Sequence, residues 1–295
     1  MFRGRNMVPN CVLTTNTKKP CVFLELESDD KKCALDKVDV VMWTKNSEKF
    51  LPLVLTRIEE VIPSDVIFNR IIIDDHSTDN TIEIAKKMGW AVYDNQGNGI
   101  YDAVETALKY VTCEFFISIE HDIILSKEWW EKMNRYMKDD TVAVAQGVRV
   151  ATSPILRKLD EYLIERGGDK SKSCISIDNN LYRTAALRKF KLNVTSHRQS
   201  CAVLEENGFK WLIDRHVISD HIRPNVKYLI MHDYKMHKLS APQIRRQRIA
   251  RNFMIFLFSP FRALQICWRK KCSQMLIIYP LDRLAILMAC LNFSH

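Results

Sequence analysis

The sequence predicts an α/β protein built on a mostly parallel, doubly wound sheet, and three observations support this prediction. Short runs rich in β-branched and aromatic residues recur at residues 38–43, 70–73, 90–93 and 114–119. Segments with helical hydrophobic periodicity separate them at residues 48–61, 79–88 and 100–110. Ile71, Ile72 and Ile73 follow one another without a polar residue, as in a strand covered on both faces. This alternation is typical of βαβ units, in which helices flank parallel strands.

The composition indicates a globular protein rather than a disordered or fibrous one. Of 295 residues, 47% are hydrophobic and 27% are charged, which suits one large domain with an appendage. The nine cysteines are scattered, without the spacing of a metal site, and the first residues lack the apolar core of a signal peptide. We therefore expect reduced thiols and a cytoplasmic location.

The first elements of the chain are an extension and then the first regular strand. Residues 1–37 form an N-terminal extension to which we assign no chemistry, although residues 21–26 have the character of an extra strand. The strand at 38–43 ends in the polar turn Thr44-Lys45-Asn46-Ser47, and the helix at 48–61 begins with Glu48. From this strand onward the βα alternation is regular.

The second strand ends in the most informative segment of the chain. Its three isoleucines lead directly into Asp74 and Asp75, and the residues from Ser77 to Asn80, with Asp79 among them, offer N-caps for the next helix. Open α/β sheets bind ligands at the carboxyl ends of their strands, where these two carboxylates emerge. By itself, the segment fits a capped turn with two solvated acids equally well.

A second acidic cluster follows the fourth strand. The third strand is followed by a flexible loop that contains Gly97 and Gly99, and the fourth, at residues 114–119, delivers Glu120-His121-Asp122. If these strands are parallel, both acidic clusters lie on one rim of the sheet. Converging carboxylates are costly unless a cation neutralises them, and oxygen ligands suit Mg²⁺ or Mn²⁺. An ordinary polar turn is the alternative for the second cluster alone.

This order of features resembles the inverting family-2 glycosyltransferases of the GT-A fold, over most of residues 38–221. The segment from Asp74 to Thr81 matches the family's DD-x-S-x-D-x-T block, and Glu120-His121-Asp122 corresponds to its DXD motif, with Glu in the first position. The resemblance implies a UDP- or GDP-sugar donor, a nucleobase contact from Asp75, and a metal held by Asp122 with Glu120. It implies donor contacts from these loop residues: Thr44, Asn46, Glu48, Asp74, Asp75, Asp79, Gly97 and Gly99.

Three arginines in the second half of the chain resemble phosphate-binding positions of the polyprenyl-phosphate (dolichyl-phosphate) mannosyltransferase branch. Arg149, Arg157 and Arg183 stand in segments similar to those of that branch, where arginines hold donor or acceptor phosphates. The planar guanidinium group binds phosphate oxygens with two hydrogen bonds. Each arginine alone fits a surface ion pair as well, so we expect the three to act jointly, with Arg149 and Arg157 in catalytic roles.

The residue expected to act as general base on the acceptor differs from that of the wider family. Many family-2 enzymes place an acidic general base about a dozen residues before a Gly-aromatic-Lys step, and Ser196 and His197 stand there in this chain. A phosphate monoester is already ionised and attacks without such a base, so the missing acid favours a lipid-phosphate acceptor. His197 is the candidate base for a hydroxyl acceptor, or else a surface histidine. His221 is a candidate metal ligand, because some family members return a histidine to the metal.

The C-terminal region, residues 240–295, is basic and apolar. Residues 241–295 contain nine Lys or Arg and one acid, Asp282, so a net charge of +8 out of the chain's +9 is concentrated there. Cationic and apolar blocks alternate, and no run reaches the roughly 20 residues of a spanning helix. We expect amphipathic helices that contact an anionic membrane surface. A helical subdomain packed on the core is an alternative, and a nucleic-acid arm is disfavoured because apolar residues dominate.

Together these features predict a metal-dependent inverting glycosyltransferase, with a catalytic domain at residues 38–239. Its donor is a nucleotide sugar, and its acceptor is a polyprenyl phosphate or another membrane-associated glycan or lipid at the cytoplasmic face of a membrane. Two alternatives remain open from the residues alone. One is a sugar nucleotidyltransferase, although the turn at residues 44–47 lacks a glycine-rich phosphate loop. The other is a non-catalytic module that binds sugar nucleotides at a membrane.

Overall fold

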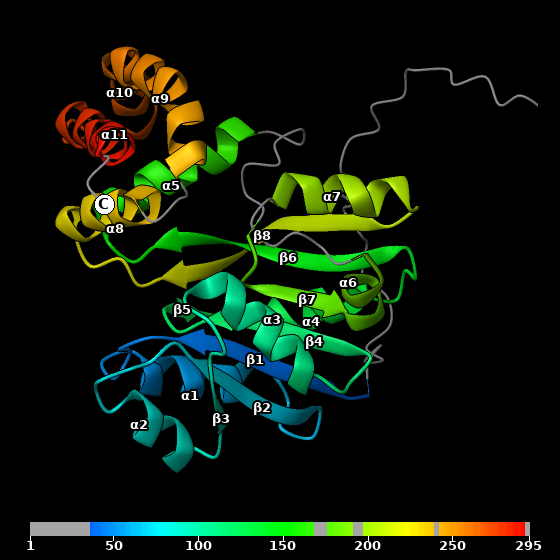
Figure 1. The fold of residues 1–295 in the computed structure, drawn as a ribbon. Coiled ribbons are helices and arrows are strands. Elements are labelled where there is room, and N and C mark those ends of the chain that lie inside the picture. The colour runs from blue at the N-terminus through cyan, green and yellow to red at the C-terminus, as the bar shows by residue number, and fades with distance from the viewer. Residues whose placement is uncertain (1–35, 168–175, 191–196, 239–241, 293–295) are drawn as a thin grey trace, which may run out of the picture.

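The computed structural model describes residues 36–167, 176–190, 197–238 and 242–292. The predicted extra strand at residues 21–26 lies outside these ranges. Eight strands form one sheet in the order β3-β2-β1-β4-β7-β6-β8-β5 (Figure 1). The strands are β1 (Val38–Thr44), β2 (Ile67–Asp74), β3 (Ala91–Asp94), β4 (Phe115–Glu120), β5 (Ile123–Ile124), β6 (Val142–Ala151), β7 (Asn180–Arg183) and β8 (Lys210–His221).

The sheet is mixed: the strands of the predicted first half pair in parallel, and β6 and β8 form a further parallel pair. β1 pairs in parallel with β2 and β4, and β2 with β3, which confirms the predicted βαβ arrangement. β7 is antiparallel to both β4 and β6, and the short β5 is antiparallel to β8. The prediction of an α/β sheet flanked by helices is confirmed.

Helices cover both faces of the sheet, as the continuous apolar strands require. Every residue of β1 is buried: Val40 and Met42 pack in one core cluster, and Val41 and Trp43 in the other. The first cluster includes α1 and α4, and the second includes α3 and α7. The helices are α1 (Leu51–Val61), α2 (Thr81–Lys87), α3 (Ile100–Tyr110), α4 (Trp129–Tyr136), α5 (Pro154–Gly167), α6 (Thr184–Phe190), α7 (His197–Glu206), α8 (Val226–Lys238), α9 (Pro242–Leu257), α10 (Ser259–Lys270) and α11 (Met275–Leu291).

The strand register brings the two acidic clusters to one rim of the sheet. Thr44, the last residue of β1, is aligned with Asp74 of β2, and its neighbour Trp43 is aligned with Glu120 of β4. The two carboxylate-bearing strand ends therefore flank the end of β1. This is the shared rim that the sequence predicts.

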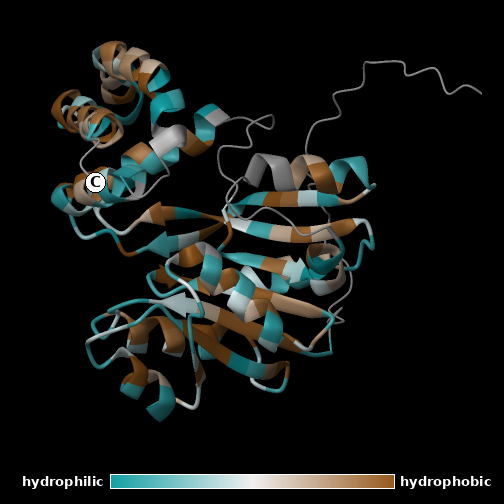
Figure 2. Cartoon of the chain, viewed as in Figure 1, coloured by the Kyte–Doolittle hydropathy of each residue, from teal (hydrophilic) through white to brown (hydrophobic). Residues whose placement is uncertain are grey.

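The C-terminal helices, defined here as α9, α10 and α11, form a layer beside that rim (Figures 1 and 2). α10 and α11 pack on α5 and α8 through a third core cluster, which includes Leu156, Tyr162, Leu229, Ile266 and Tyr279, and α9 packs on α11. The predicted helical C-terminal region is thereby confirmed. None of the helices that the structure describes has both the length and the apolar character needed to cross a bilayer.

Candidate functional site

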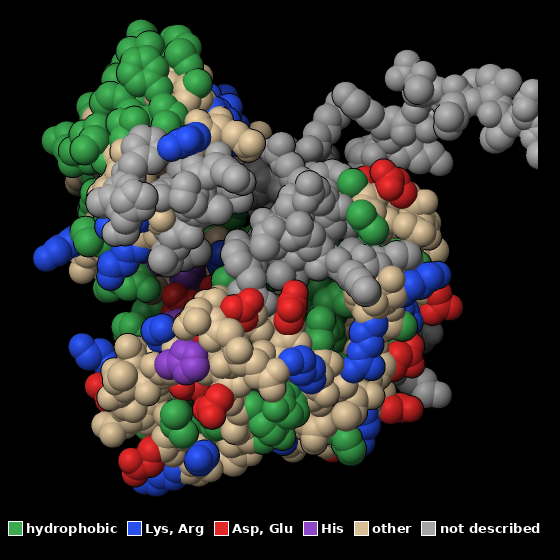
Figure 3. All heavy atoms as spheres, viewed as in Figure 1, with side chains coloured by type: hydrophobic (Ala, Val, Ile, Leu, Met, Phe, Trp, Pro, Cys, Tyr) green, Lys and Arg blue, Asp and Glu red, His purple; other side chains and the backbone are tan. Residues whose placement is uncertain are grey.

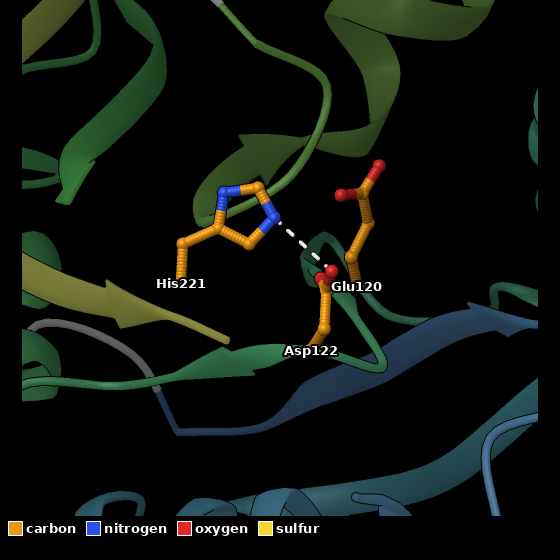
Figure 4. Close-up of side chains that lie close together, drawn as sticks. All are labelled: Glu120, Asp122 and His221. Atoms are coloured by element: carbon orange, nitrogen blue, oxygen red, sulfur yellow. Dashed lines mark hydrogen bonds and ion pairs between the residues drawn. The ribbon is translucent and has the colours of Figure 1, made fainter. Parts of the chain in front are cut away.

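Glu120, Asp122 and His221 form a compact cluster at the rim of the sheet (Figure 4). Glu120 ends β4, Asp122 lies in the turn before β5, and His221 ends β8. One ligand atom from each residue lies within 4.8 Å of those from the other two. The antiparallel pairing of Ile123 in β5 with His221 brings the histidine to the acidic turn.

Asp122 is buried, and its two oxygens have different surroundings. Oδ2 lies 3.0 Å from His221 Nε2, whereas Oδ1 is buried without a hydrogen-bond partner among the described residues. Burial acts to raise the pKa of Asp122, but the hydrogen bond to His221 and the positive charge of nearby Arg149 hold it well below its usual range. Burial lowers the pKa of His221 more than Asp122 raises it.

These residues fit a divalent metal ion. The pKa directions describe an ionised carboxylate and a neutral imidazole, which are the protonation states that metal ligands need. Glu120 adds a second, half-buried carboxylate, and the unpartnered Asp122 Oδ1 is an oxygen that a cation would satisfy. Two carboxylates and one imidazole suit Mn²⁺ or Mg²⁺ completed by ligand oxygens and water.

Arg149 connects this cluster to an acid that the sequence analysis missed. Arg149, in β6, lies 3.6 Å from Glu120 Oε2 and forms a close ion pair with Asp178, whose side chain is 1% exposed. Asp178 Oδ1 has no hydrogen-bond partner among the residues described. The only sequence signal for Asp178 is its place in the polar run that precedes β7. The pair holds the guanidinium of Arg149 beside Glu120.

The other two arginines of the predicted trio lie elsewhere. Arg157, in the first turns of α5, donates to Asp220 Oδ1 at 2.9 Å, so it is next to the cluster but already paired. Arg183 is aligned with Phe115, at the opposite end of β4 from Glu120. The structure therefore does not bring Arg183 together with Arg149 and Arg157. Because β7 runs antiparallel to β4, its last residue points to the far rim, where Arg183 pairs with Glu114.

The candidate base His197 is the first residue of α7. Its side chain lies outside the described part of the chain. α7 packs against β8 through Cys201 and Leu204 in the core cluster that also contains Trp211. The candidate is thus located only by its backbone.

Asp75 is the centre of a second hydrogen-bond network on the same rim, among the residues predicted to contact the donor. Its Oδ1 accepts hydrogen bonds from the Gly99 amide and the Asn95 side chain, both at 2.8 Å, and its Oδ2 pairs with Lys45 Nζ at 3.0 Å. Burial acts to raise the pKa of Asp75, but these three donors lower it overall. Gly99 has φ +82°, a conformation that glycine adopts without strain. Asp75 therefore ties the glycine loop to the turn after β1.

The remaining predicted donor residues hold the rim loops to one another. Asn46 donates its amide to Ser77 Oγ at 2.9 Å, and Glu48 donates its amide to Asp79 Oδ2 at 3.2 Å. Asp74, which is buried, accepts from the amide and the hydroxyl of Ser77, and Thr44 donates its hydroxyl to Ser47. Gly97 faces the side chain of Asp102 so closely that a Cβ would lie 2.1 Å from its Oδ2. These hydrogen bonds connect the rim loops to one another.

Two further residues near the cluster were not singled out from the sequence. Tyr228, in the first turn of α8, is half-buried, and burial and the charges of Asp122 and Glu120 raise its pKa. Asp160, in α5, lies 3.8 Å from Arg223, and burial raises the pKa of its carboxyl despite that cation. Both helices thus add polar groups beside the cluster, and neither segment has a motif that predicts them.

Comparison with protein families gives one match that covers more than half of the chain. A family model described as "Glycosyl transferase family 2" matches residues 39–207. A search of the curated proteins gave no match.

Comparison with solved structures gives many similar chains at low sequence identity. A mannosyltransferase, PcManGT from Pyrobaculum calidifontis, in complex with GDP-Man and Mn²⁺, has a TM-score of 0.55 at 15% identity, covering 88% of this chain and 77% of that one. TarS 1–349 from S. aureus, in complex with UDP-GlcNAc, has a TM-score of 0.52 at 13% identity, with coverage of 87% and 91%. Glucosyl-3-phosphoglycerate synthase from Mycobacterium tuberculosis has a TM-score of 0.50 at 14% identity, with coverage of 66% and 73%. At these identities the likeness establishes a shared fold.

Proposed function

The chain belongs to glycosyl transferase family 2, and from that membership we propose that it moves a sugar from a nucleotide-sugar donor to an acceptor, with inversion at the anomeric carbon. The observation that carries the proposal is the cluster of Glu120, Asp122 and His221 on the same rim as the Asp75 network. The cluster is the proposed metal site, and the Asp75 network is the proposed binding surface for the nucleotide. A donor that spans both has its diphosphate at the cluster.

The metal site takes Mn²⁺ or Mg²⁺ on Asp122, with Glu120 and His221 as further ligands. When bound, the ion supplies charge neutralisation for the leaving nucleotide. The protein's own part is to keep Asp122 ionised and His221 neutral in a buried position. Mn²⁺ accompanies GDP-Man in the PcManGT complex, which supports the proposal by analogy of fold.

The donor side is built to select and orient the nucleotide. Asp75, fixed by Gly99, Asn95 and Lys45, contributes nucleobase selection, and the neighbouring loops line the base and the ribose. Arg149, held by Asp178 beside Glu120, is placed to contact a diphosphate. The related folds were solved with GDP-Man, UDP or UDP-GlcNAc, so the proposed donor class is a GDP- or UDP-sugar.

The proposed acceptor is a polyprenyl phosphate. Its phosphate is ionised at neutral pH and attacks the anomeric carbon without a base, from the face opposite the leaving nucleotide. Among the described residues, the other carboxylates beside the metal ligands, Asp178, Asp220 and Asp160, each face an arginine, namely Arg149, Arg157 and Arg223, so none of them is an unpaired base. A glycan hydroxyl acceptor would need one, with His197 as the candidate.

We assign separate roles to the two predicted regions of the chain. Residues 38–239 form the catalytic domain, and residues 240–295 hold it peripherally at the cytoplasmic face of a membrane, where a lipid acceptor resides. Nucleic acid has no part in this proposal.

Product analysis tests the proposed reaction. The protein is incubated with GDP- and UDP-sugars, Mn²⁺ and a short-chain polyprenyl phosphate, and the products are separated. A glycosyltransferase releases a nucleoside diphosphate and a glycosylated lipid phosphate, whereas a nucleotidyltransferase turns over only when pyrophosphate is added, and then gives a nucleoside triphosphate and a sugar 1-phosphate. A non-catalytic module gives a thermal shift with a sugar nucleotide but no turnover. Either of the last two results overturns the proposal.

A further inference from the structure

The C-terminal helices expose an unusual amount of apolar surface for a folded protein. Fourteen large hydrophobic side chains between residues 253 and 291 are exposed, among them Trp268 at 79%, Phe261 at 69% and Ile277 at 67%. Figure 3 shows hydrophobic side chains gathered over the part of the molecule where Figure 1 places α9 to α11. Contiguous apolar surface of this kind marks an interaction site.

The exposed residues form stripes on the outer faces of α10 and α11 and a patch at the end of α9. On α10 and α11 most of them recur at helical spacing and share a face opposite the packed one, whereas on α9 they surround the last turn of the helix. On α11 they are Leu276, Ile277, Leu281, Leu284, Met288 and Leu291; on α10, Phe261, Leu264 and Trp268; and at the end of α9, Phe253, Met254, Ile255 and Leu257, with Phe258 directly after it. The inner faces also bury apolar residues, among them Ala263, Ile266, Met275 and Ile278. α10 and α11 are therefore apolar on the side where a water-facing helix would be polar.

Positive charge accompanies the apolar stripes, and exposed negative charge does not. Exposed cations on or between these helices are Arg246, Arg251, Arg269 and Lys271. The sole acid of residues 241–295, Asp282, is buried. A surface that is apolar with a cationic border complements an anionic bilayer, in which acyl chains take up the stripes and phosphate headgroups meet the cations.

We propose that the outer faces of α9, α10 and α11 insert into the interfacial layer of an anionic lipid bilayer, with the aromatic side chains of Trp268 and Phe261 as anchors. Tryptophan is the side chain best suited to this depth, because its ring is apolar and its N–H bonds at the headgroup level. The inference deepens the proposed function, because a lipid-phosphate acceptor must be collected from such a surface.

A second copy of the chain fits this surface less well than a bilayer does. A symmetric contact would bring the same patch from both copies together, so the cations of one would meet those of the other without an exposed acid to pair with. A bilayer supplies the opposite charge. Charge complementarity therefore favours the lipid surface.

Two of the C-terminal helices pack on the helices that follow the strands of the candidate site: α10 packs on α5, and α11 packs on α8. α5 begins three residues after β6, and α8 begins five residues after His221, the end of β8. α10 is fixed to α5 by a hydrogen bond from Tyr162 to Gln265 at 3.1 Å, and α11 packs on α8, near which Asn292 donates to Tyr234 at 3.0 Å. Insertion of the outer faces therefore places the metal-binding rim close to the headgroup layer.

Flotation with vesicles tests the surface directly. The full chain is mixed with vesicles of equal parts phosphatidylcholine and phosphatidylglycerol, and with vesicles of phosphatidylcholine alone. Phe261→Glu and Ile277→Glu each lower the partition coefficient on the anionic vesicles about tenfold or more, because a charge replaces an inserted apolar side chain. Phe68→Glu is the matched control, since Phe68 is 58% exposed but lies in β2, away from these helices. It leaves partitioning unchanged.

Tryptophan fluorescence gives a second readout. Five of the six tryptophans are at most 6% exposed, and Trp268 alone is on the surface. Phosphatidylcholine brominated on its acyl chains, mixed into the anionic vesicles, quenches Trp268 on contact. Trp268→Phe removes the quenching while the protein still floats with the vesicles.

Three results would overturn the inference: no flotation with anionic vesicles, equal loss of binding in the Phe68 control, or a dimer in light scattering that Phe261→Glu and Ile277→Glu convert to a monomer. Failure here is distinguishable from failure of the proposed reaction. Mn²⁺-dependent binding of a soluble sugar nucleotide is measured on the same variants, and it stays unchanged because the substituted side chains lie outside the donor site.

Discussion

His221 Nε2 lies 3.0 Å from Asp122 Oδ2, although the two residues are 99 positions apart in the sequence. The contact depends on β8 reaching β5 at the edge of the sheet, so it is a product of the whole fold. It joins a carboxylate and an imidazole at the point where Glu120 also ends its strand.

Replacing His221 by alanine is expected to weaken Mn²⁺ binding about ten- to a hundredfold. The loss should be larger at pH 5.5 than at pH 8. Burial acts to raise the pKa of Asp122, and His221 is the main group that opposes it, so without His221 this pKa rises and protons compete with the metal at low pH. Calorimetric titration with Mn²⁺ at both pH values checks this. Equal losses at the two pH values would contradict it.

Replacing Arg149 by methionine is expected to destabilise the fold by roughly 3 kcal/mol, because it leaves the buried carboxylate of Asp178 without a counter-ion. The double variant Arg149→Met/Asp178→Asn should regain most of this stability, since no charge is left unpaired. Urea unfolding of the single and double variants measures the difference. If Arg149→Met and the double variant unfold at the same urea concentration, the pair does not have this role.

Replacing Asp75 by alanine is expected to raise KM for the donor about tenfold or more, with a smaller effect on kcat. The carboxylate fixes Gly99, Asn95 and Lys45 on the nucleotide side and lies outside the metal cluster. Steady-state kinetics with GDP- and UDP-sugars check this, and Asp94→Ala, at the end of β3, is the control. A drop in kcat with unchanged KM would place Asp75 in the chemical step.

Local sequence signals predict the strands and helices of the first half of the fold well. Hydrophobic periodicity predicts the helix at residues 100–110, and polar residues directly after apolar runs predict the strand ends at Asp74 and Glu120. The direction of β7 does not, and its antiparallel pairing is what moves Arg183 to the far rim. Asp178 and Tyr228 were missed because their roles depend on contacts with residues distant in the chain, which have no local pattern.

Asp282 gives the C-terminal helices a pH-dependent stability. It is fully buried in α11, where burial, only partly offset by Arg283, raises its pKa to about 6. A raised folded pKa means that the native state binds the extra proton, so this stabilisation is complete below the unfolded pKa near 4 and is lost as the pH rises through 6.

Replacing Asp282 by asparagine should remove this dependence. The variant should gain roughly 2 to 3 kcal/mol relative to the wild type between pH 4 and pH 7.5, because the amide carries no charge to bury. Unfolding by urea at pH 5 and pH 7.5 provides the test, with Asp140→Asn as an exposed control. A gain that is equal at both pH values would rule out Asp282 as the titrating group.

The central claim is that Asp122 holds the metal on which sugar transfer depends. The most direct measurement is the release of nucleoside diphosphate from the preferred sugar nucleotide, with Mn²⁺ or with EDTA, by the wild type and by Asp122→Asn. The account predicts Mn²⁺-dependent release by the wild type that EDTA abolishes. It predicts a loss of at least a hundredfold in Asp122→Asn, with an unchanged circular dichroism spectrum. Full Mn²⁺-dependent release by the folded variant would contradict the assignment of this site.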